Sequence, residues 1–286
     1  MSKKAFVLDA SALIYRAYFA SYKQLEYNKA HNVPPNNAIK LVGKMLKNIM
    51  QFDAYDYALV ALDSPHQTLR KDVYSDYKKD RKPMDQELVD QLEPIKELFH
   101  ILGLKTFVYP GYEADDIVGS FARFCNEKNI HVDVFSSDKD LLQLVNELTQ
   151  VHLFKTGVSV LQTNNIANFA EQNNDLLPLQ IIDFKALAGD SSDNLTGVRG
   201  IGKQTALNLI LNFDSLDNIY NNLDKCSNSI QTKLINDKEN AYLCYELAKI
   251  KTDLLETAVL DDFVVKQIDD DALSDFLMRW KINLSF

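Results

Sequence analysis

The chain has 286 residues, of which 46% are hydrophobic and 25% charged, and its formal net charge is −9. This composition supports a sizeable core and excludes a disordered, collagen-like or coiled-coil chain. The acidic balance argues against a passive nucleic-acid coating protein, which would usually be basic. No apolar run approaches the ~20 residues of a membrane span, and the three cysteines are widely spaced, so we expect a reduced, cytoplasmic, globular protein.

Strand and helix patterns alternate through the first part of the chain. In chain order the apolar patterning predicts a strand at 5–8, a helix from Ser11, a helix at 37–52, a strand at 58–62, a helix at 85–102, a strand at 106–109, a helix at 113–129 and a strand at 132–135. Pro94 predicts a kink or a restart in the helix at 85–102. Segments 151–154 and 158–161, on either side of Gly157, are typical of a hairpin. The alternation favours an α/β fold with a mainly parallel central sheet.

After about Asn173 the pattern becomes helical throughout. We therefore predict two domains, an α/β domain over 1–173 and a smaller all-α domain over 174–286. The sequence shows no internal repeat and no low-complexity tract. Because no Pro/Gly/Ser-rich linker separates the two parts, we expect them to pack together.

Acidic residues follow several of the predicted strands. Asp9, Asp63 and Asp138 each end a strand. The carboxyl ends of parallel strands lie along one edge of a sheet, and ligand sites form there. Further acids begin the next helix, follow the last of these strands or lie in a later acidic segment: Glu113, Asp115, Asp116, Asp140, Asp190 and Asp193. Nine carboxylates could therefore converge on one site.

Each acid taken singly has a structural explanation, because Asp after a strand is often a helix N-cap, and an acid in a first turn gains about 0.3–1 kcal/mol. Structural roles do not explain a converging set of nine acids, because two carboxylates roughly 4 Å apart repel by about 4 kcal/mol at an effective dielectric constant of about 20. A converging set needs a cation. Oxygen ligands without clustered His or Cys favour Mg²⁺ or Mn²⁺ over zinc. A carboxylate cage for two divalent ions is typical of phosphodiester hydrolysis.

The segment 70–82 follows the strand that ends at Asp63 and combines bases with tyrosines. Basic residues with interleaved aromatics suit a nucleic-acid strand, because Lys and Arg meet phosphates and Tyr stacks on bases. A solvated face with i,i+4 ion pairs is the alternative, and it is the better explanation of the segment by itself. The position after Asp63 strengthens the functional interpretation. The bases and tyrosines are Arg70, Lys71, Tyr74, Tyr77, Lys78, Lys79, Arg81 and Lys82.

Three glycines, Gly197, Gly200 and Gly202, precede a further predicted helix. They permit a tight hairpin, and the helix N-terminus offers backbone N–H groups to a phosphate. Arg199 and Lys203 add positive charge, which indicates a contact to the DNA backbone that is blind to base sequence. The glycine spacing fits neither a dinucleotide-binding motif nor a P-loop. A plain helix–turn–helix packing motif remains the alternative.

The most specific motifs are Gly-Tyr-Glu-Ala-Asp-Asp at 111–116 and Gly-Asp-Ser-Ser-Asp-Asn at 189–194. Further segments accompany them in the same order: Phe-Val-Leu-Asp at 6–9, Ala-Leu-Asp at 61–63, Tyr-Lys-x-x-Arg at 77–81, Ser-Asp-Lys-Asp at 137–140 and Gly-Val-Arg-Gly-Ile-Gly at 197–202. This set resembles the 5′-nuclease (flap endonuclease) family, in particular the N-terminal 5′–3′ exonuclease domain of bacterial DNA polymerase I. The resemblance covers almost the whole chain.

The resemblance implies a PIN-like nuclease domain with a helical arch over about 64–91, and a C-terminal helix–three-turn–helix DNA-binding domain. Two Mg²⁺ ions would be bound, with Mn²⁺ able to substitute, and a K⁺ ion would lie at the glycine hairpin. The first metal site would be formed by Asp9, Asp63, Glu113, Asp115 and Asp116, and the second by Asp138, Asp140, Asp190 and Asp193.

The resemblance also implies roles for basic and aromatic residues. Lys78, Arg81 and Arg16 would act near the scissile phosphate, Arg70 would hold a phosphate and Tyr77 would stack on a base. The duplex would be gripped by Gly197, Arg199, Gly200, Gly202 and Lys203. Thr196 stands where relatives usually have Pro, a change that we expect to loosen the turn and leave the glycines intact.

We therefore expect a divalent-metal-dependent 5′–3′ exonuclease and 5′-flap endonuclease that acts on DNA and RNA primer remnants in replication and repair. It would leave 5′-phosphate and 3′-hydroxyl ends, act as a monomer and work beside a DNA polymerase and a ligase. A non-catalytic junction-binding protein is an alternative, against which the intact acids count. A phosphomonoesterase with Asp9 as nucleophile would need Asp in place of Ser11, and PIN-type ribonucleases are much shorter. The sequence leaves open whether the chain is a stand-alone nuclease or a polymerase I domain.

Overall fold

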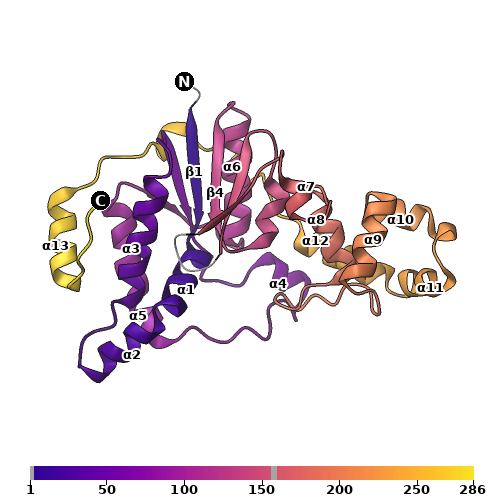
Figure 1. Ribbon diagram of the computed structural model, residues 1–286, viewed down its shortest axis with the longest axis horizontal. Coiled ribbons are helices and arrows are strands. Elements are labelled where there is room, and N and C mark those ends of the chain that lie inside the picture. Colours follow the sequence, from indigo (N-terminus) through magenta and orange to yellow (C-terminus); the bar gives the residue numbers. More distant parts are fainter. Residues whose placement is uncertain (1–2, 156–159) are drawn as a thin grey trace.

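The computed structural model describes residues 3–155 and 160–286, and a six-stranded sheet lies at the centre of its first domain (Figure 1). The strand order is β3-β2-β1-β4-β5-β6; strands β1 to β5 run parallel to one another, and β6 runs antiparallel to β5. The strands are β1 (Lys4–Asp9), β2 (Tyr57–Ala61), β3 (Lys105–Phe107), β4 (His131–Ser136), β5 (Thr149–Phe154) and β6 (Leu161–Asn164). The mainly parallel central sheet that the sequence predicts is confirmed.

Alternating side chains of β1 explain why helices cover both faces of this sheet. Phe6 and Leu8 belong to the core on one face. Ala5 and Val7 belong to the core on the other face, as the two-residue period of a strand requires. The first face is covered by α1 (Ala10–Ala20), α3 (Asn37–Met50) and α5 (Gln86–Ile101), with α2 (Tyr22–Ala30) beyond them, and the second by α6 (Ala114–Asn126).

The second domain is helical and has a core of its own. Figure 1 shows its helices at one end of an elongated molecule, so the predicted all-α C-terminal region is confirmed. Its buried residues include Leu187, Ile210 and Leu234. Two short 3₁₀ segments, η1 (Lys139–Leu144) and η2 (Leu223–Lys225), lie before and within it. Its helices are α8 (Gln180–Ala188), α9 (Lys203–Phe213), α10 (Leu216–Asn221), α11 (Asn228–Asn236) and α12 (Lys238–Ala248), and the short α7 (Phe169–Gln172) precedes them.

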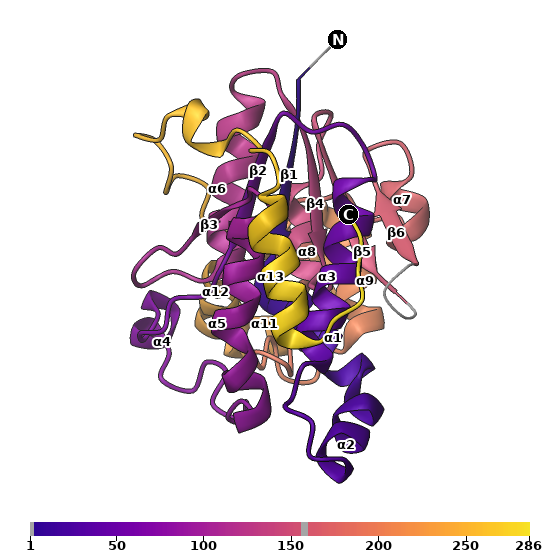
Figure 2. The ribbon, with the colours of Figure 1, turned by 90° about the vertical axis from the view of Figure 1, so that its left-hand side faces the viewer.

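The end of the chain returns to the first domain, which the helical patterning after Asn173 did not indicate. Through η3 (Leu260–Phe263) it reaches β2, where the Val265 backbone N donates to the Asp56 carbonyl at 3.0 Å. Helix α13 (Asp270–Trp280) then packs beside α5, as Figure 2 shows, and buries Phe276 in the core of the first face. Apolar side chains of α13 therefore complete a core that lies far away in sequence.

Three predicted elements differ from the structure. Helix α5 continues through Pro94 as one element, rather than restarting there. The second strand of the hairpin is β6, which starts at Leu161, and Gly157 lies outside the described residues. The predicted arch is helical in α4 (Leu69–Val73) and again from Gln86, with turns and irregular backbone between. Within the described ranges, no helix is long and apolar enough to cross a membrane.

Candidate active site

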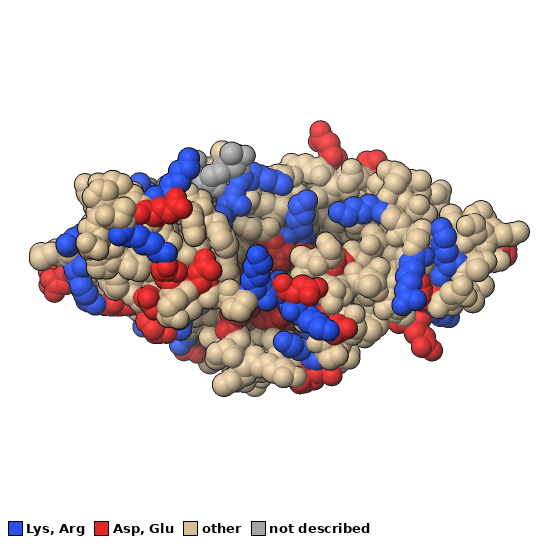
Figure 3. Space-filling model, turned by 90° about the horizontal axis from the view of Figure 1, so that it is seen from below, with Lys and Arg blue, Asp and Glu red and all other residues tan. Residues whose placement is uncertain are grey.

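A cavity of about 470 Å³ opens at the edge of the sheet where β1 and β4 end. Figure 3 views the molecule from this side, with acidic side chains in a hollow near the middle and Lys and Arg side chains around it. Asp116 and Asp190 lie beside the cavity and share ion-pair partners with its acids. The structure thus brings the nine acids together. Those that line the cavity are Asp9, Asp63, Glu113, Asp115, Asp138, Asp140 and Asp193.

The acids at the strand ends also accept hydrogen bonds from the first turns of helices α1 and α6. Asp9 Oδ1 accepts a hydrogen bond from the Ala12 backbone N at 3.0 Å, and its Oδ2 accepts one from Ser136 Oγ at 2.8 Å. Asp63 Oδ1 accepts one from the Ala114 backbone N at 2.9 Å. Burial, together with the charge of Asp63, raises the pKa of Asp9 to about 7. These hydrogen bonds therefore explain where the two carboxylates lie, but they supply no positive charge to offset the repulsion between them.

Arg70, from α4, lies among the acids that open α6. Its Nη1 donates to Glu113 Oε2 at 2.8 Å and to Asp115 Oδ1 at 3.0 Å. Its Nη2 donates to Asp116 Oδ1 at 2.7 Å. Burial, with repulsion from Asp115, raises the pKa of Asp116 to about 7. Burial opposes the ionisation of Asp115 as well, but Arg70 and Lys78 offset it and hold the pKa of Asp115 below its usual value.

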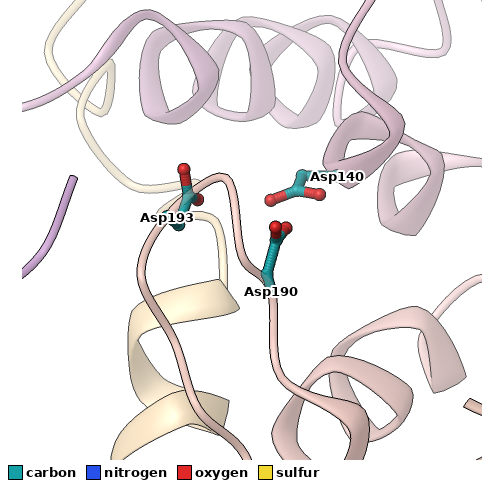
Figure 4. A group of neighbouring side chains, drawn as sticks. All are labelled: Asp140, Asp190 and Asp193. Atoms are coloured by element: carbon teal, nitrogen blue, oxygen red, sulfur yellow. The ribbon is translucent and has the colours of Figure 1, made fainter. Parts of the chain in front are cut away.

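A second group of acids, Asp140, Asp190 and Asp193, lies near the end of α8. Carboxylate oxygens of the three lie within 4.8 Å of one another, and Figure 4 shows the three side chains close together. Lys185 pairs with Asp140, and its Nζ lies 2.5 Å from Asp190 Oδ2. Burial and the charge of Asp138 raise the pKa of Asp140 to about 7. Burial opposes the ionisation of Asp190, yet Lys185 lowers its pKa to about 2.

These basic side chains do not neutralise the site. Four basic side chains pair with the nine carboxylates and Lys82 also lines the cavity, so that among the described residues the acids outnumber the bases by four when every acid is ionised. The raised pKa values of Asp9, Asp116 and Asp140 follow from this excess and from burial. Oxygen ligands with excess negative charge are the donor set of Mg²⁺ and Mn²⁺. The basic side chains that pair with the acids are Arg70, Lys78, Arg81 and Lys185.

Ser137 and Lys185 are among the residues of the site that were not singled out from the sequence. Ser137 lines the cavity, and its buried Oγ has no hydrogen-bond partner within the part of the chain that the structure describes. Buried hydroxyls normally have a partner, so this oxygen suits a group that enters the cavity. The sequence does carry a signal for Lys185. It is the one basic residue in the mainly apolar α8, where a buried Lys needs an acidic partner, and Asp190 follows five residues later.

The arch reaches both groups of acids. Lys78 Nζ donates to Glu113 Oε2 at 2.8 Å and lies 3.9 Å from Asp193 Oδ1. The Lys78 backbone N also donates to the Asp193 carbonyl at 3.1 Å. The exposed Arg81 donates from Nη2 to Asp193 Oδ1 at 3.3 Å. Burial opposes a raised pKa at Lys78, but the charges of Glu113 and Asp193 outweigh it, so its pKa lies above the usual value and the ammonium stays charged.

Tyr77 and Arg16 lie differently from their expected positions. The ring of Tyr77 is 2% exposed, and its hydroxyl donates to Glu113 Oε2 at 3.0 Å. A buried ring has no free face for a base in this conformation, and the stacking role of Tyr77 stays a prediction. Arg16 lies on α1, outside the described lining of the cavity, and burial lowers its pKa. Its role near a scissile phosphate stays a prediction.

The glycine hairpin is held from behind by polar side chains. Gly197 has a φ of 60°, and a Cβ there would clash with the Gly189 backbone, so glycine is required. Asn240 Nδ2 donates to the Gly197 carbonyl and, at 3.0 Å, to Thr196 Oγ1. Thr196 therefore ties the turn to α12. We expected Thr in place of Pro to loosen the turn, and this hydrogen bond opposes that effect. Lys233 Nζ donates to the Gly200 carbonyl at 3.0 Å.

Gly202 stands apart from the other glycines of the hairpin. It is the N-cap of α9, with an ordinary φ of −86°, and a Cβ there would meet no described heavy atom within 4 Å. The fold itself thus does not require glycine at this position, which suits the close approach of a ligand backbone. Arg199 and Lys203 are exposed beside it. The arrangement offers backbone N–H groups and two positive charges to a phosphate.

Comparison with known proteins assigns both domains. The family model "5'-3' exonuclease, N-terminal resolvase-like domain" matches residues 4–173, and "5'-3' exonuclease, C-terminal SAM fold" matches residues 176–271. The 5′–3′ exonuclease of Mycoplasma pneumoniae is 41% identical over 280 residues, which are 98% of this chain and 96% of that protein. DNA polymerase I of Lactococcus lactis subsp. lactis is 37% identical over 96% of this chain, but the match covers 31% of that longer protein.

A solved structure has the same fold. The bacteriophage T5 flap endonuclease, in a pseudo-enzyme–product complex with DNA and metal ions, superposes with a TM-score of 0.69 at 20% identity. The superposition covers 98% of this chain and 100% of that one. At this identity the likeness concerns the fold, including the placing of a helical domain beside a mostly parallel sheet.

Proposed function

The chain belongs to the 5′–3′ exonuclease family, and we propose that its acidic cavity is a two-metal centre that cleaves DNA at 5′ ends and at 5′ flaps. The observation that carries this proposal is the convergence of nine carboxylates that outnumber the basic side chains around them. Products would carry 5′-phosphate and 3′-hydroxyl ends. RNA primer remnants beside DNA would be substrates of the same reaction, and the enzyme would act in the cytoplasm.

The donor set fits two divalent ions, with Mg²⁺ proposed as the physiological metal and Mn²⁺ as a substitute. When bound, such ions supply an activated water and stabilise the leaving oxygen. One would be held by acids that end β1, follow β2 and open α6, and the other by acids after β4 and after α8. The first set is Asp9, Asp63, Glu113 and Asp115, with Asp116 behind them, and the second is Asp138, Asp140, Asp190 and Asp193.

The basic residues of the site would bind and orient the substrate phosphate. Lys78 lies between the two acid groups, so its ammonium can pass from Glu113 and Asp193 to a phosphate oxygen and stabilise developing charge. Arg81 is exposed beside it and would hold a neighbouring phosphate. Arg70 lies deeper, with the acids on three sides, and would mainly fix the positions of Glu113 and Asp115.

The glycine hairpin would grip the duplex part of the substrate through its backbone. Gly202 leaves room for a DNA strand, and Arg199 and Lys203 would pair with phosphates. Contacts of this kind read no base sequence, which suits an enzyme that recognises a junction. A K⁺ ion at the hairpin remains part of the proposal, and replacing K⁺ by Na⁺ in the buffer should then weaken duplex binding. We propose a monomer that works beside a DNA polymerase and a ligase.

The test is a cleavage assay on a 5′-flap duplex with a fluorescent label on the flap. In Mg²⁺ we expect cleavage at the junction, and a 5′-labelled duplex without a flap should release short fragments from its end. EDTA should abolish both reactions, and Mn²⁺ should restore them. Binding of the flap duplex without cleavage in either metal would contradict the proposal and favour a junction-binding protein. Cleavage that persists in EDTA would contradict the metal centre.

A further inference from the structure

A second cavity lies away from the catalytic one, where the two domains meet. Its volume is about 810 Å³, against about 470 Å³ for the catalytic cavity, and none of the described residues lines both. Its walls are the segment 145–147 after η1, the segment 177–180 that leads into α8, and the facing parts of α10 and α12. We call this cavity the interdomain groove. Its size alone is sufficient for several side chains of a partner.

Large apolar side chains line the interdomain groove and remain exposed. Leu179 is 69% exposed, Leu177 is 57% exposed and Ile166 is 52% exposed. Val145 and Leu216 form buried parts of the wall behind them. Single exposed apolar residues are common on proteins, but apolar residues gathered in a concave site mark a place for binding. The groove therefore offers pockets for apolar side chains.

Every charged residue that lines the described part of the interdomain groove is acidic. Two of the acids are held in place: Asp183 Oδ1 accepts from the Leu216 backbone N at 2.8 Å, and Asp217 Oδ1 accepts from the Tyr242 hydroxyl at 2.7 Å. Burial raises the pKa of Asp183, and the charge of Asp217 adds to that shift. The acids of the groove are Glu147, Asp183, Asp214, Asp217 and Glu246.

The acidic rim makes DNA an unsuitable occupant, because phosphates would be repelled at every side of the groove. The position of the groove agrees with this. Helix α8 begins at Gln180, which lines the groove, and its other end leads to Gly189 and Asp190 at the catalytic site. A nine-residue helix is about 13 Å long, so an occupant of the groove would leave the DNA face clear.

The segment that carries the exposed leucines is fixed before any partner binds. Gln180 Oε1 accepts from the Leu177 backbone N at 2.8 Å, and Gln180 Nε2 donates to the Asp214 carbonyl at 2.9 Å. Pro178, between the two leucines, is buried and restricts the backbone further. A rigid apolar surface loses little conformational entropy when a partner covers it, which favours binding.

We propose that the interdomain groove docks a basic amphipathic segment of a partner protein. Apolar side chains of that segment would cover Leu177 and Leu179, and its Lys or Arg residues would pair with the acids of the rim, Asp217 and Glu246 among them. The charge of the rim selects a basic partner, and the leucines provide the apolar anchor. Partner and DNA occupy separate surfaces, so the enzyme can be tethered while it cuts.

The test pans a phage-displayed library of random 12-residue peptides against the full chain, with excess 5′-flap duplex and EDTA present to cover the DNA surface. Enriched peptides are synthesised, and their affinities are measured by fluorescence anisotropy for the natural chain and four variants. Leu177→Asp/Leu179→Asp removes the anchor, and Met278→Asp is its control at a 74% exposed position on α13. Asp217→Asn/Glu246→Gln removes rim charge, and Asp271→Asn/Asp275→Asn is the matched control on α13.

We expect the enriched peptides to combine Lys or Arg with large apolar residues. The leucine variant should weaken binding at least about tenfold and the rim variant about threefold, while both controls bind as the natural chain does. Flap binding and cleavage should be unchanged in all four variants, which shows that each is folded. Enriched peptides that lack basic residues, that bind the leucine variant equally well, or that flap DNA displaces would overturn the proposal, as would a library that yields no binder.

Discussion

The catalytic cavity and the glycine hairpin both face the proposed DNA, but they are built in opposite ways. The cavity is made of charged side chains from segments between Asp9 and Asp193, whose repulsion the fold balances in part with Arg70 and Lys185. The hairpin is made of backbone, held from behind by Asn240. The difference indicates that catalytic turnover and DNA affinity depend on separate parts of the molecule. Substitutions in the cavity should change turnover, and substitutions at the hairpin should change affinity.

The largest effect is expected for Asp138→Ala and Asp115→Ala. Loss of a ligand should remove several kcal/mol of transition-state stabilisation, so that turnover of the flap duplex falls by about a thousandfold or more. The Kd for the same duplex should change by less than about threefold, because the hairpin still grips it. Single-turnover cleavage and anisotropy measure the two quantities, with Asp271→Ala on α13 as control. An equal loss of affinity and turnover would contradict the claim that the cavity determines turnover while the hairpin determines affinity.

A smaller effect is expected for Lys78→Met, which keeps the length of the side chain and removes its charge. Lys78 lies between the two acid groups, and the loss of one charge-stabilising donor lowers turnover by about a hundredfold. Its neighbour Lys79 is exposed and pairs with Asp76, so Lys79→Met is the control and should cut normally. Single-turnover rates at saturating enzyme decide the point. Equal rates for the two variants would remove Lys78 from the chemistry.

At the hairpin, Arg199→Ala should leave the rate at saturation unchanged and raise the Kd by about fivefold. Loss of one phosphate contact should also reduce the slope of log Kd against log salt by about 1. Affinities at several KCl concentrations measure this, with the exposed Arg123 on α6 changed to Ala as control. A changed cleavage rate with an unchanged salt slope would show that Arg199 acts in catalysis and would contradict the assignment of the hairpin to DNA binding alone.

The smallest effect concerns stability and pH. Asp9, Asp116 and Asp140 have pKa values raised to about 7 in the folded chain, above those of unfolded Asp near 3.9. Between these values the folded state binds more protons than the unfolded state, so stability falls as pH rises through this window. In EDTA we expect the Tm to drop by a few degrees, on the order of 2–5 °C, between pH 5.5 and pH 8.

Mg²⁺ should restore the Tm most at pH 8, because it binds the ionised acids. Thermal unfolding with and without Mg²⁺ at the two pH values measures this. Arg199→Ala should show the same pH dependence as the natural chain, since the hairpin lies outside the acid cluster. A Tm in EDTA that rises from pH 5.5 to pH 8 would show that the acids are already compensated by basic side chains.

The sequence was sufficient for what depends on strand pattern and on local motifs. The parallel sheet follows from apolar runs such as 5–8, and the meeting of Asp9 with Asp138 follows from the topology of parallel strands. It was insufficient where a side chain could reach several partners. The Lys and Tyr of segment 70–82 suit a nucleic acid, yet Tyr77 is buried against Glu113, because folding the arch onto α6 gives its hydroxyl an acceptor.

Long-range packing was the other limit. The period of α13 predicts a helix but not the surface that it covers, and its Phe276 packs against a core formed mainly by residues 6–104. In the same way, Pro94 lies inside α5 without ending it, because the packing of Ile95 and Leu98 in the core outweighs one lost backbone hydrogen bond. Tertiary contacts decided both cases.

A metal-binding titration tests the central claim most directly. Mn²⁺ is added to the DNA-free chain, and the free ion is followed by its electron paramagnetic resonance signal. The account predicts two saturable sites in the natural chain and one in each of the variants Asp115→Ala and Asp138→Ala, with Asp271→Ala keeping two. The absence of saturable binding, or an equal number of sites in all four proteins, would contradict a metal centre built from these acids.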